Sequence, residues 1–319
     1  MDGPRAAVAA LFITLLVIAP ASLAKPANQL ADLLALEARV QNVIERVNPA
    51  VVSVRIQGGS GSGVVIGNEG YVLTAAHVSG QPGRPCIITF PNGTRVNGVS
   101  LGRHPANDSG LLRITDPGRF PTVELGPADL PEIGQWTLAL GHPQGFQPQR
   151  PVVARLGQVI AARPATLQTD CTLIGGDSGG PLFDLDGRVI AIHSRIGGPT
   201  GHNFHAPVGV FLDRWDDLTA SREVAPGFLG VSGDNHPKGA KIDHVFPDTA
   251  AHAADLAPGD VITHVDGQRV RSFRELAALI NERGAGDRLQ LTTLRRSKTH
   301  THNLTLTPRP TAPEPAATP

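Results

Sequence analysis

The sequence predicts a mainly β protein in which a large all-β domain is followed by a smaller α+β domain. From residue 49 to residue 220, short β-rich runs are punctuated by glycine and proline, and Asn92-Gly93 and Asp186-Gly187 are typical of hairpin turns. A polar stretch, residues 221–226, then indicates a linker. Residues 227–307 mix strand-like runs with one helical segment, which predicts a second domain of a different class.

The beginning of the chain, residues 1–24, has the pattern of a secretory signal. An arginine precedes the apolar run Ala6–Ala19, and small residues follow it. The run stops at Pro20, short of the ~20 residues that span a membrane, so a cleaved signal is favoured over an uncleaved anchor. We therefore expect a secreted or periplasmic protein without a stable membrane span. Removing the signal leaves 319 − 24 = 295 residues, enough for two domains of ~100–200 residues.

Residues 25–48 are expected to form an N-terminal helix. Apolar residues recur there at steps of three and four, which places them on one side of a helix. They are Leu33, Leu36, Val40, Val43 and Val47. The stripe predicts a helix that packs on the β domain, although the same stripe could serve a short coiled coil.

Composition excludes several classes of function. The 28 basic and 28 acidic residues balance, and an aromatic content of 4% provides no stacking platform, so no nucleic-acid partner is expected. The cores must instead depend on valine, leucine and isoleucine. Cys86 and Cys171 are the only cysteines, which excludes a disulfide scaffold and leaves either one bridge or two buried thiols.

The stretch Ile174–Pro181 contains the candidate nucleophile, Ser178, between pairs of glycines. Glycines before a catalytic serine let backbone N–H groups turn inward, so the amides of Gly176 and Ser178 are candidate donors to an oxyanion. A glycine-rich turn alone is weak evidence, because such turns also join ordinary strands.

A serine hydroxyl needs a base, and two residues have suitable surroundings. His77 follows the apolar runs that end at Leu73, and Asp108 stands directly before the apolar strand that contains Leu111 and Leu112. The chain order is therefore histidine, aspartate, serine. His77 would accept the serine proton, and Asp108 would orient the ring and stabilise the imidazolium.

These three motifs together resemble the chymotrypsin-like serine proteases, and more closely the HtrA (Deg) family. The matching residues are Gly61–Ile66 with Gly70–Thr74, then His77, then Asp108, and lastly Thr169-Asp170 leading to Gly176–Pro181. The resemblance runs from about Val47 to about Leu306. It implies that residues 49–220 form a two-barrel chymotrypsin-like protease domain and that the protein assembles into trimers.

The resemblance also implies which residues bind the substrate. The oxyanion hole would be formed by Gly176, Asp177 and Ser178. Substrate would contact the residues Thr172, Leu173, Ile174, Ile192, His193, Ser194 and Arg195. A trypsin-like pocket would have an acid at Thr172, so this neutral residue favours cleavage after small or medium apolar side chains instead.

Residues 227–307 look like a PDZ domain of the HtrA type, with a helical segment at Ser272–Glu282. The backbone at Phe228, Leu229, Gly230 and Val231 would bind the carboxylate of a peptide, although Phe228 and Leu229 could also be plain core residues. Two departures from the family are Asp255, where glycine is usual, and the polar insertion Ser232–Gly239. Residues 308–319 should form a disordered Pro-rich tail.

The protease domain departs from the family at two places. Asp177 stands where asparagine is usual, and a buried unpaired carboxylate would be costly, so it is either solvated or paired, with His193 and Arg195 the nearest candidate partners. The connection Ala161–Leu167 is much shorter than the loop that in the family relays PDZ occupancy to the active site, so regulation could differ.

We therefore expect an exported, ATP-independent serine endopeptidase that acts on misfolded or partner proteins. The alternatives are a catalytically weak peptide-binding chaperone on the same fold and a secreted protease specialised on one partner. No cofactor or metal is expected, because His202 and His205 have no helix and no nearby carboxylate or thiol to complete a zinc site.

Overall fold

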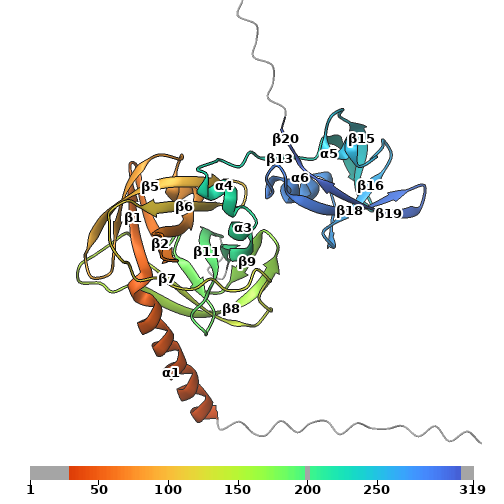
Figure 1. Cartoon of the computed structure of the whole chain (residues 1–319). Coiled ribbons are helices and arrows are strands. Elements are labelled where there is room, and N and C mark those ends of the chain that lie inside the picture. The colour runs from red at the N-terminus through yellow and green to blue at the C-terminus, as the bar shows by residue number, and fades with distance from the viewer. Residues whose placement is uncertain (1–28, 198–201, 310–319) are drawn as a thin grey trace, which may run out of the picture. The chain divides into compact units, whose positions relative to one another are not determined.

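A computed structural model describes residues 29–197 and 202–309 (Figure 1). The expected secretory signal and residues 310–319 of the expected tail lie outside these ranges. Strands predominate in the described residues, where they close into two barrels and form a separate sheet. The predicted fold class, mainly β with a final α+β domain, is confirmed.

The first barrel contains six antiparallel strands in the order β1-β2-β3-β6-β5-β4. These are β1 (Val51–Ile56), β2 (Gly59–Ile66), β3 (Tyr71–Ala75), β4 (Pro85–Thr89), β5 (Arg95–His104) and β6 (Ser109–Ile114). Buried residues alternate with more exposed ones along β5, as expected for a strand with one face inside a barrel. Strands β3 and β6 pair side by side in this barrel. His77 follows the end of β3 and Asp108 precedes the start of β6, so the two residues emerge at the same end of the paired strands.

The second barrel has the order β10-β11-β12-β9-β8-β7. Its strands are β7 (Trp136–Gly141), β8 (Val153–Arg163), β9 (Thr166–Thr169), β10 (Pro181–Phe183), β11 (Val189–Ile196) and β12 (Asn203–Pro207). The segment predicted as a short connection, Ala161–Leu167, is largely strand: β8 continues to Arg163 and β9 begins at Thr166, so only Pro164 and Ala165 form the turn.

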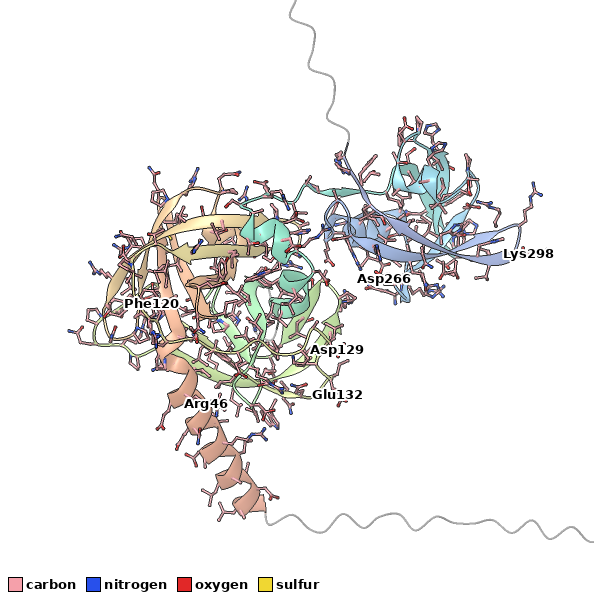
Figure 2. The ribbon with its side chains drawn as sticks, in the orientation of Figure 1. Arg46, Phe120, Asp129, Glu132, Asp266 and Lys298 are labelled. Carbon is pink, nitrogen blue, oxygen red and sulfur yellow. The ribbon has the colours of Figure 1, made fainter. Side chains whose placement is uncertain are left out.

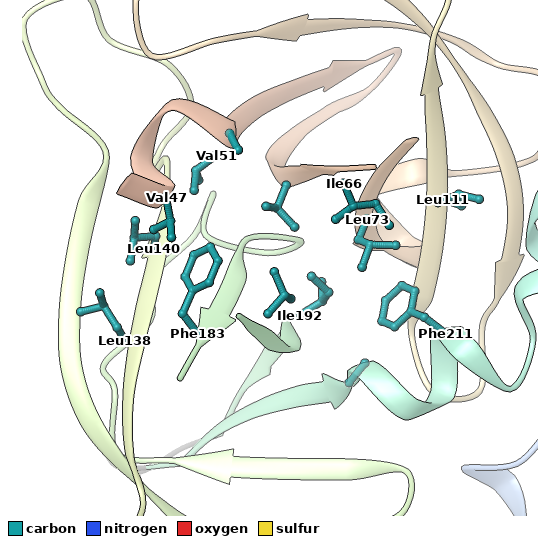
Figure 3. Close-up of a cluster of buried hydrophobic side chains, with 14 of the residues drawn as sticks. Val47, Val51, Ile66, Leu73, Leu111, Leu138, Leu140, Phe183, Ile192 and Phe211 are labelled. Atoms are coloured by element: carbon teal, nitrogen blue, oxygen red, sulfur yellow. The ribbon is translucent and has the colours of Figure 1, made fainter. Parts of the chain in front are cut away.

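A single apolar cluster joins the two barrels (Figure 3). Leu73 and Leu111 come from the first barrel, Phe183 and Ile192 from the second, and all four are fully buried. Phe211 of α3 (Val208–Leu212) completes the cluster, and α4 (Trp215–Thr219) follows it. The core thus fixes the two barrels against each other and holds the strands that carry the candidate catalytic residues.

The two cysteines lie in separate barrel cores. Cys86 belongs to a cluster of the first barrel and Cys171 to a cluster of the second, and both are free and buried. Of the two alternatives left open by the sequence, buried thiols are therefore correct. Burial raises the pKa of the Cys86 thiol to about 11.

The N-terminal helix α1 (Gln29–Val47) is followed by the 3-10 turn Asn48–Ala50. Only its last part packs as predicted: Val43 and Val47 are buried in the cluster between the barrels, whereas Leu33 is 62% exposed. Arg46, on the last turn (Figure 2), donates a hydrogen bond to the carbonyl of Asp186. Among the helices that the structure describes, none is long and apolar enough to cross a membrane.

The C-terminal domain is built on a sheet with the strand order β14-β15-β16-β18-β19, and β17 pairs with β16. Its elements are β13 (Gly227–Phe228), β14 (Val231–His236), β15 (Gly239–Val245), α5 (Ala250–Ala253), β16 (Val261–Val265), β17 (Gln268–Arg269), α6 (Phe273–Asn281), β18 (Arg288–Arg295), β19 (Lys298–Thr305) and β20 (Thr307–Pro308). The predicted helix is α6, and the Ser272 side chain caps it by accepting from the amide of Glu275.

The structure gives paired or hydrogen-bonded backbone in three segments that the sequence suggested were an insertion, a tail and a linker. The supposed polar insertion, Ser232–Gly239, supplies most of edge strand β14 and its turn into β15. Pro308, which was expected in the disordered tail, lies in β20 and pairs with Gly227 of β13. The linker is not free of the protease domain, since Arg103 of β5 exchanges backbone hydrogen bonds with Arg222 and Val224. Asp255 has φ +54°, a left-handed conformation that explains why glycine suits this position.

Candidate active site

His77 lies on the one-turn helix α2 (Ala76–Ser79), directly after β3. Its ring Nδ1 is 2.9 Å from Oδ2 and 3.0 Å from Oδ1 of Asp108, and its backbone N–H donates to the same carboxylate. A carboxylate can only accept, so Nδ1 carries the hydrogen and Nε2 is left to act as a base. The hydrogen bond that His77 donates to Asp108 raises the pKa of His77 above its ordinary value, against the opposing effect of burial.

Asp108 is held in place by contacts on both sides. Its φ of +60° is uncommon for a residue with a side chain, although aspartate tolerates it better than most. Its carbonyl accepts from the amide of Ala76, and its Oδ2 accepts from Ser194 Oγ at 2.6 Å. Sequence reasoning placed Ser194 among the substrate-binding residues and missed this second contact.

Ser178 reaches the same cluster through Ser194. Its Oγ lies 3.5 Å from the Ser194 carbonyl, the limit of a hydrogen bond. Within the described residues no hydrogen bond joins Ser178 Oγ to the His77 ring. Long or missing hydrogen bonds are common between catalytic groups before substrate binds. The structure thus links His77, Asp108 and Ser178 through Ser194, and the serine hydroxyl contacts the Ser194 carbonyl.

The backbone before Ser178 is the segment predicted to form an oxyanion hole. Gly176 has φ +98°, and a Cβ there would lie 2.3 Å from the Gln144 nitrogen, so both conformation and space require glycine. In the part of the chain that the structure describes, the amides of Gly176 and Ser178 donate to no other group. The amide of Asp177 donates to the Ile174 carbonyl at 3.1 Å. Two of the three predicted donors are therefore free.

Ser62 of β2 anchors this loop to the first barrel. Its amide donates to the Ser178 carbonyl at 2.8 Å, and its fully buried hydroxyl donates to the Gly176 carbonyl at 2.8 Å. The same hydroxyl accepts from the amide of His142 at 2.8 Å. The sequence displayed Ser62 only as part of a glycine-rich strand, and no local signal indicated a contact with residues more than a hundred positions away.

Asp177 is buried, with 1% of its surface exposed, and its partner is Arg155 of β8. Arg155 Nη2 lies 3.0 Å from Asp177 Oδ2, which also accepts from the amide of Ile174 at 3.0 Å. The prediction that His193 or Arg195 pairs with Asp177 is wrong. Both ring nitrogens of His193 have other partners, and the Arg195 guanidinium lies over the ring of Phe204.

Burial raises the pKa of Asp177, even though the Ile174 amide and Arg155 act in the opposite direction. The sequence did contain a signal for the missed partner of Asp177. Arg155 is the only charged residue between Pro151 and Ala162. A lone charge among apolar residues is expected to have a partner where its side chain is turned inward, but the sequence does not say which loop faces that strand.

Two buried histidines lie beneath the nucleophile loop. His193 Nε2 is 3.2 Å from the Leu140 carbonyl, and His193 Nδ1 is 3.0 Å from His205 Nδ1. His205 Nε2 is 2.8 Å from Thr169 Oγ1. Since the Leu140 carbonyl can only accept, the neutral tautomers follow: His193 carries its hydrogen on Nε2 and His205 on Nδ1, and Thr169 donates to His205.

Both histidines are held neutral. Burial lowers the pKa of His205 to about 3. Burial, and then the charges of His205 and Arg155, lower the pKa of His193 well below its ordinary value. The loop is attached directly to this pair, because His193 exchanges backbone hydrogen bonds with Gly179 and Gly180.

The remaining predicted substrate residues fall into two groups. Ile192 and Leu173 are buried, and the Leu173 amide donates to Asn203 Oδ1 at 3.1 Å, so neither side chain is open to a substrate in this structure. Thr172, Ile174 and Arg195 are exposed. Strand β11 pairs with β10 only as far as Ile192, which leaves its edge beside Ser178 without a partner strand.

The turn predicted to bind a peptide carboxylate in the second domain is held by packing and by backbone hydrogen bonds. Leu229 is buried in the domain core, and Gly230 has φ +85° with its Cα packed against Thr249, where a Cβ would lie 2.2 Å from the Thr249 side chain. The carbonyls of these two residues accept from Ala251 and Phe246. Strand β14, which begins at Val231, is at the edge of its sheet.

Comparison with family models divides the chain as the fold does. A trypsin-like peptidase domain matches residues 61–192, and a PDZ domain matches residues 227–306. These segments include the three catalytic candidates and the predicted peptide-binding turn.

Curated relatives are named probable periplasmic serine endoprotease DegP-like. The protein of Halomonas elongata is 32% identical over 255 residues, covering 74% of this chain and 53% of the relative. That of a Marinomonas strain is 34% identical over 275 residues, covering 80% and 58%. The chain thus spans a little more than half the length of these relatives.

Solved structures with the same fold include a serine endoprotease from Yersinia pestis, 27% identical with a TM-score of 0.59, covering 84% of this chain and 97% of that one. The HtrA-type protease AlgW with a tripeptide is 25% identical with a TM-score of 0.62, covering 86% and 98%. Domain matches, relatives and structures agree: the chain belongs to the HtrA family, whose members join a trypsin-like protease domain to a PDZ domain.

Proposed function

We propose that this protein is a serine endopeptidase with Ser178 as nucleophile, His77 as general base and Asp108 as the residue that orients the base. The observation that carries the proposal is the position of the Asp108 carboxylate, which binds the His77 ring on one side and Ser194 on the other. Ser194 in turn contacts Ser178. The three predicted residues are therefore linked at one site although they come from both barrels.

The chemistry follows from the hydrogen-bond roles. With Nδ1–H bound to Asp108, His77 Nε2 takes the Ser178 proton as Oγ attacks the substrate carbonyl. The developing oxyanion is bound by the amides of Gly176 and Ser178. His77 then gives its proton to the leaving amine, and a water molecule repeats the sequence to release the acyl group.

Substrate binding is proposed along the free edge of β11. An extended substrate would add to Ser194–Ile196 as an antiparallel strand, and its backbone would then compete with Ser178 for the Ser194 carbonyl. Losing that contact would free the serine hydroxyl to turn towards His77. The side chain before the scissile bond would lie near Thr172 and Ile174, with no acid among them to select a basic residue.

The wider role rests on the family. A periplasmic or secreted location is proposed because the relatives are named periplasmic endoproteases. Protein quality control without ATP, trimer formation, and substrates that are misfolded or partner proteins are proposed from the resemblance to the HtrA family alone. The PDZ domain is proposed to bind peptides with free C-termini through the Phe228–Val231 turn and edge strand β14. Calorimetry on the full-length Ser178→Ala protein should then show weaker binding of amidated peptides than of free ones.

The test of the activity is cleavage of casein together with covalent labelling by a fluorophosphonate. Ser178→Ala should abolish labelling and lower turnover by up to about 10⁶-fold. Because the pKa of His77 is raised by Asp108, kcat/KM should increase with pH through a midpoint above 6.5. Undiminished cleavage by purified Ser178→Ala would refute the assignment.

One observation favours the rival function, a peptide-binding chaperone that cleaves poorly. The Ser178 hydroxyl contacts Ser194 and not His77. If that arrangement persists with substrate bound, the protein will suppress aggregation of an unfolded client without cleaving it and will not react with the fluorophosphonate. Rapid labelling would rule the chaperone-only function out.

A further inference from the structure

A buried ion pair lies directly beneath the loop that forms the candidate oxyanion hole. The Asp177 carboxylate and the Arg155 guanidinium are 3.0 Å apart, and their side chains are 1% and 18% exposed. Asp177 Oδ1 and Arg155 Nη1 have no other hydrogen-bond partner within the described residues. Each charge therefore depends mainly on the other, and neither can be removed without leaving its partner buried and uncompensated.

Asp177 is also the residue that organises the loop. Its carboxylate and its amide bind the amide and the carbonyl of Ile174, and its carbonyl accepts from the amide of Gly180. The two free amides of the oxyanion hole, at Gly176 and Ser178, are its immediate neighbours. The direction in which the Asp177 side chain points therefore determines where these amides point.

Other cations near Asp177 do not replace Arg155. The Arg150 guanidinium donates to the carbonyls of Pro143 and Gly145, and the fully buried His193 is neutral. The Asp177 carboxylate also packs closely on Gly141, where a Cβ would lie 2.6 Å from Asp177 Oδ1. Arg155 of β8 is thus the cation that pairs with Asp177, and the carboxylate lies against the backbone of Gly141.

We propose that Arg155 is a positioning residue for the protease reaction, an internal counter-ion that holds the oxyanion hole open through Asp177. The inference rests on the proposed function. An unpaired Asp177 carboxylate would turn towards water, because burying it alone is costly, and the neighbouring amides of Gly176 and Ser178 would turn with it. Because the cation belongs to the barrel, Asp177 needs no newly cut chain end as its counter-ion.

The test compares the variants Arg155→Gln and Asp177→Asn with the double variant that carries both changes. Each single change leaves one buried charge and should slow fluorophosphonate labelling of Ser178 by about 10²-fold, the effect of losing one oxyanion-hole donor. The double variant places two neutral amides together and should recover to within about tenfold of wild type. Its loss will then be far smaller than the product of the single losses.

A pH profile separates positioning from general destabilisation. In Arg155→Gln, Asp177 is tolerated only when protonated, so labelling relative to wild type should fall further as pH rises, whereas the Asp177→Asn variant should show no such trend. Arg295→Gln is the matched control, because it removes the arginine partner of the buried Asp260 carboxylate in the PDZ domain. It should lower thermal stability and leave the labelling rate unchanged.

Two outcomes would overturn the inference about Arg155. Labelling of folded Arg155→Gln within threefold of wild type, or single losses that multiply in the double variant, would show that Arg155 does not position the hole. If Arg155→Gln does not fold, Asp177→Asn and the double variant still provide the comparison. A wild-type protein that is not labelled, or a Ser178→Ala protein labelled equally well, would instead refute the proposed function, and the inference with it.

Discussion

Acid should destabilise the protease domain, because His193 and His205 must gain protons when it unfolds. Both rings are buried and neutral in the folded protein, where the pKa of His205 is about 3 and that of His193 is well below its ordinary value. In the unfolded chain both histidines titrate near 6.5. Below that pH the unfolded state binds more protons than the folded state, so the free energy of unfolding decreases as the pH falls.

The magnitude follows from this difference in protonation. Between about pH 6.5 and the folded pKa, each histidine costs about 1.4 kcal/mol per pH unit. From pH 7 to pH 5, His205 alone should remove about 2 kcal/mol, and His193 adds a loss of the same sign and up to the same size. A total near 4 kcal/mol is a large part of the ~5–15 kcal/mol that stabilises a typical domain.

The assay is urea unfolding at pH 7 and pH 5, followed by tryptophan fluorescence. Both tryptophans, Trp136 and Trp215, belong to the protease domain, so the signal reports that domain. The double variant His193→Gln with His205→Gln keeps hydrogen-bonding side chains and removes both titrating groups. It should be less stable at pH 7, yet lose about 2–4 kcal/mol less than wild type on acidification.

The difference between wild type and the double variant is decisive, because carboxylates and other histidines contribute equally to both. Substitution of the exposed His300 by glutamine is the control and should leave the pH dependence unchanged. An equal loss of stability in wild type and the double variant would show that the buried pair is not neutral in the folded state, and the tautomers derived from its hydrogen bonds would then be wrong.

Three further predictions concern the loop and the thiols. Ser62→Ala leaves the Gly176 carbonyl without its donor and should cost about 1–3 kcal/mol in urea unfolding while slowing fluorophosphonate labelling; unchanged values in both assays would contradict the anchor. Gly176→Ala should slow fluorophosphonate labelling of Ser178 by about 10²-fold. Gly175→Ala is the control, because the space around its Cβ position is open, and it should be labelled at the normal rate. Equal labelling rates for the two variants would refute the steric argument. Cys86 and Cys171 should react with Ellman's reagent only after unfolding; a disulfide in non-reducing mass spectrometry would contradict the structure.

The catalytic candidates could be read from the sequence because each has a local motif. His77 follows a strand, Asp108 precedes one, and Ser178 stands among glycines whose positive φ angles the loop requires. The β-rich class of the first domain and the α+β class of the second follow from the same kind of signal, since strand periodicity and turn residues are local properties. The two barrels and the PDZ sheet were expected only from the resemblance to the HtrA family. What the structure adds to these motifs is the hydrogen bonds that link them.

The partners of these residues could not be read from the sequence, because they depend on which strands face one another. Arg155 meets Asp177 only because β8 pairs with β7 in a closed barrel, and His193 meets His205 only because β11 pairs with β12 in one register. The sequence did present a lone arginine in an apolar strand. Choosing the partner of Asp177 by nearness in the chain gave the wrong residues, His193 and Arg195, since pairing distance in a barrel is unrelated to sequence distance.

The layer beneath the nucleophile loop combines two kinds of buried polar contact that support each other electrostatically. Arg155 neutralises Asp177, and its charge also lowers the pKa of His193, so the same cation that fixes the oxyanion loop helps to keep the histidine chain uncharged. A protonated His193 would add a second positive charge and lose its acceptor nitrogen, which breaks the contact with His205. The backbone of His193 holds Gly179 and Gly180, so a disturbed histidine chain would act on the loop that Arg155 holds from its other side.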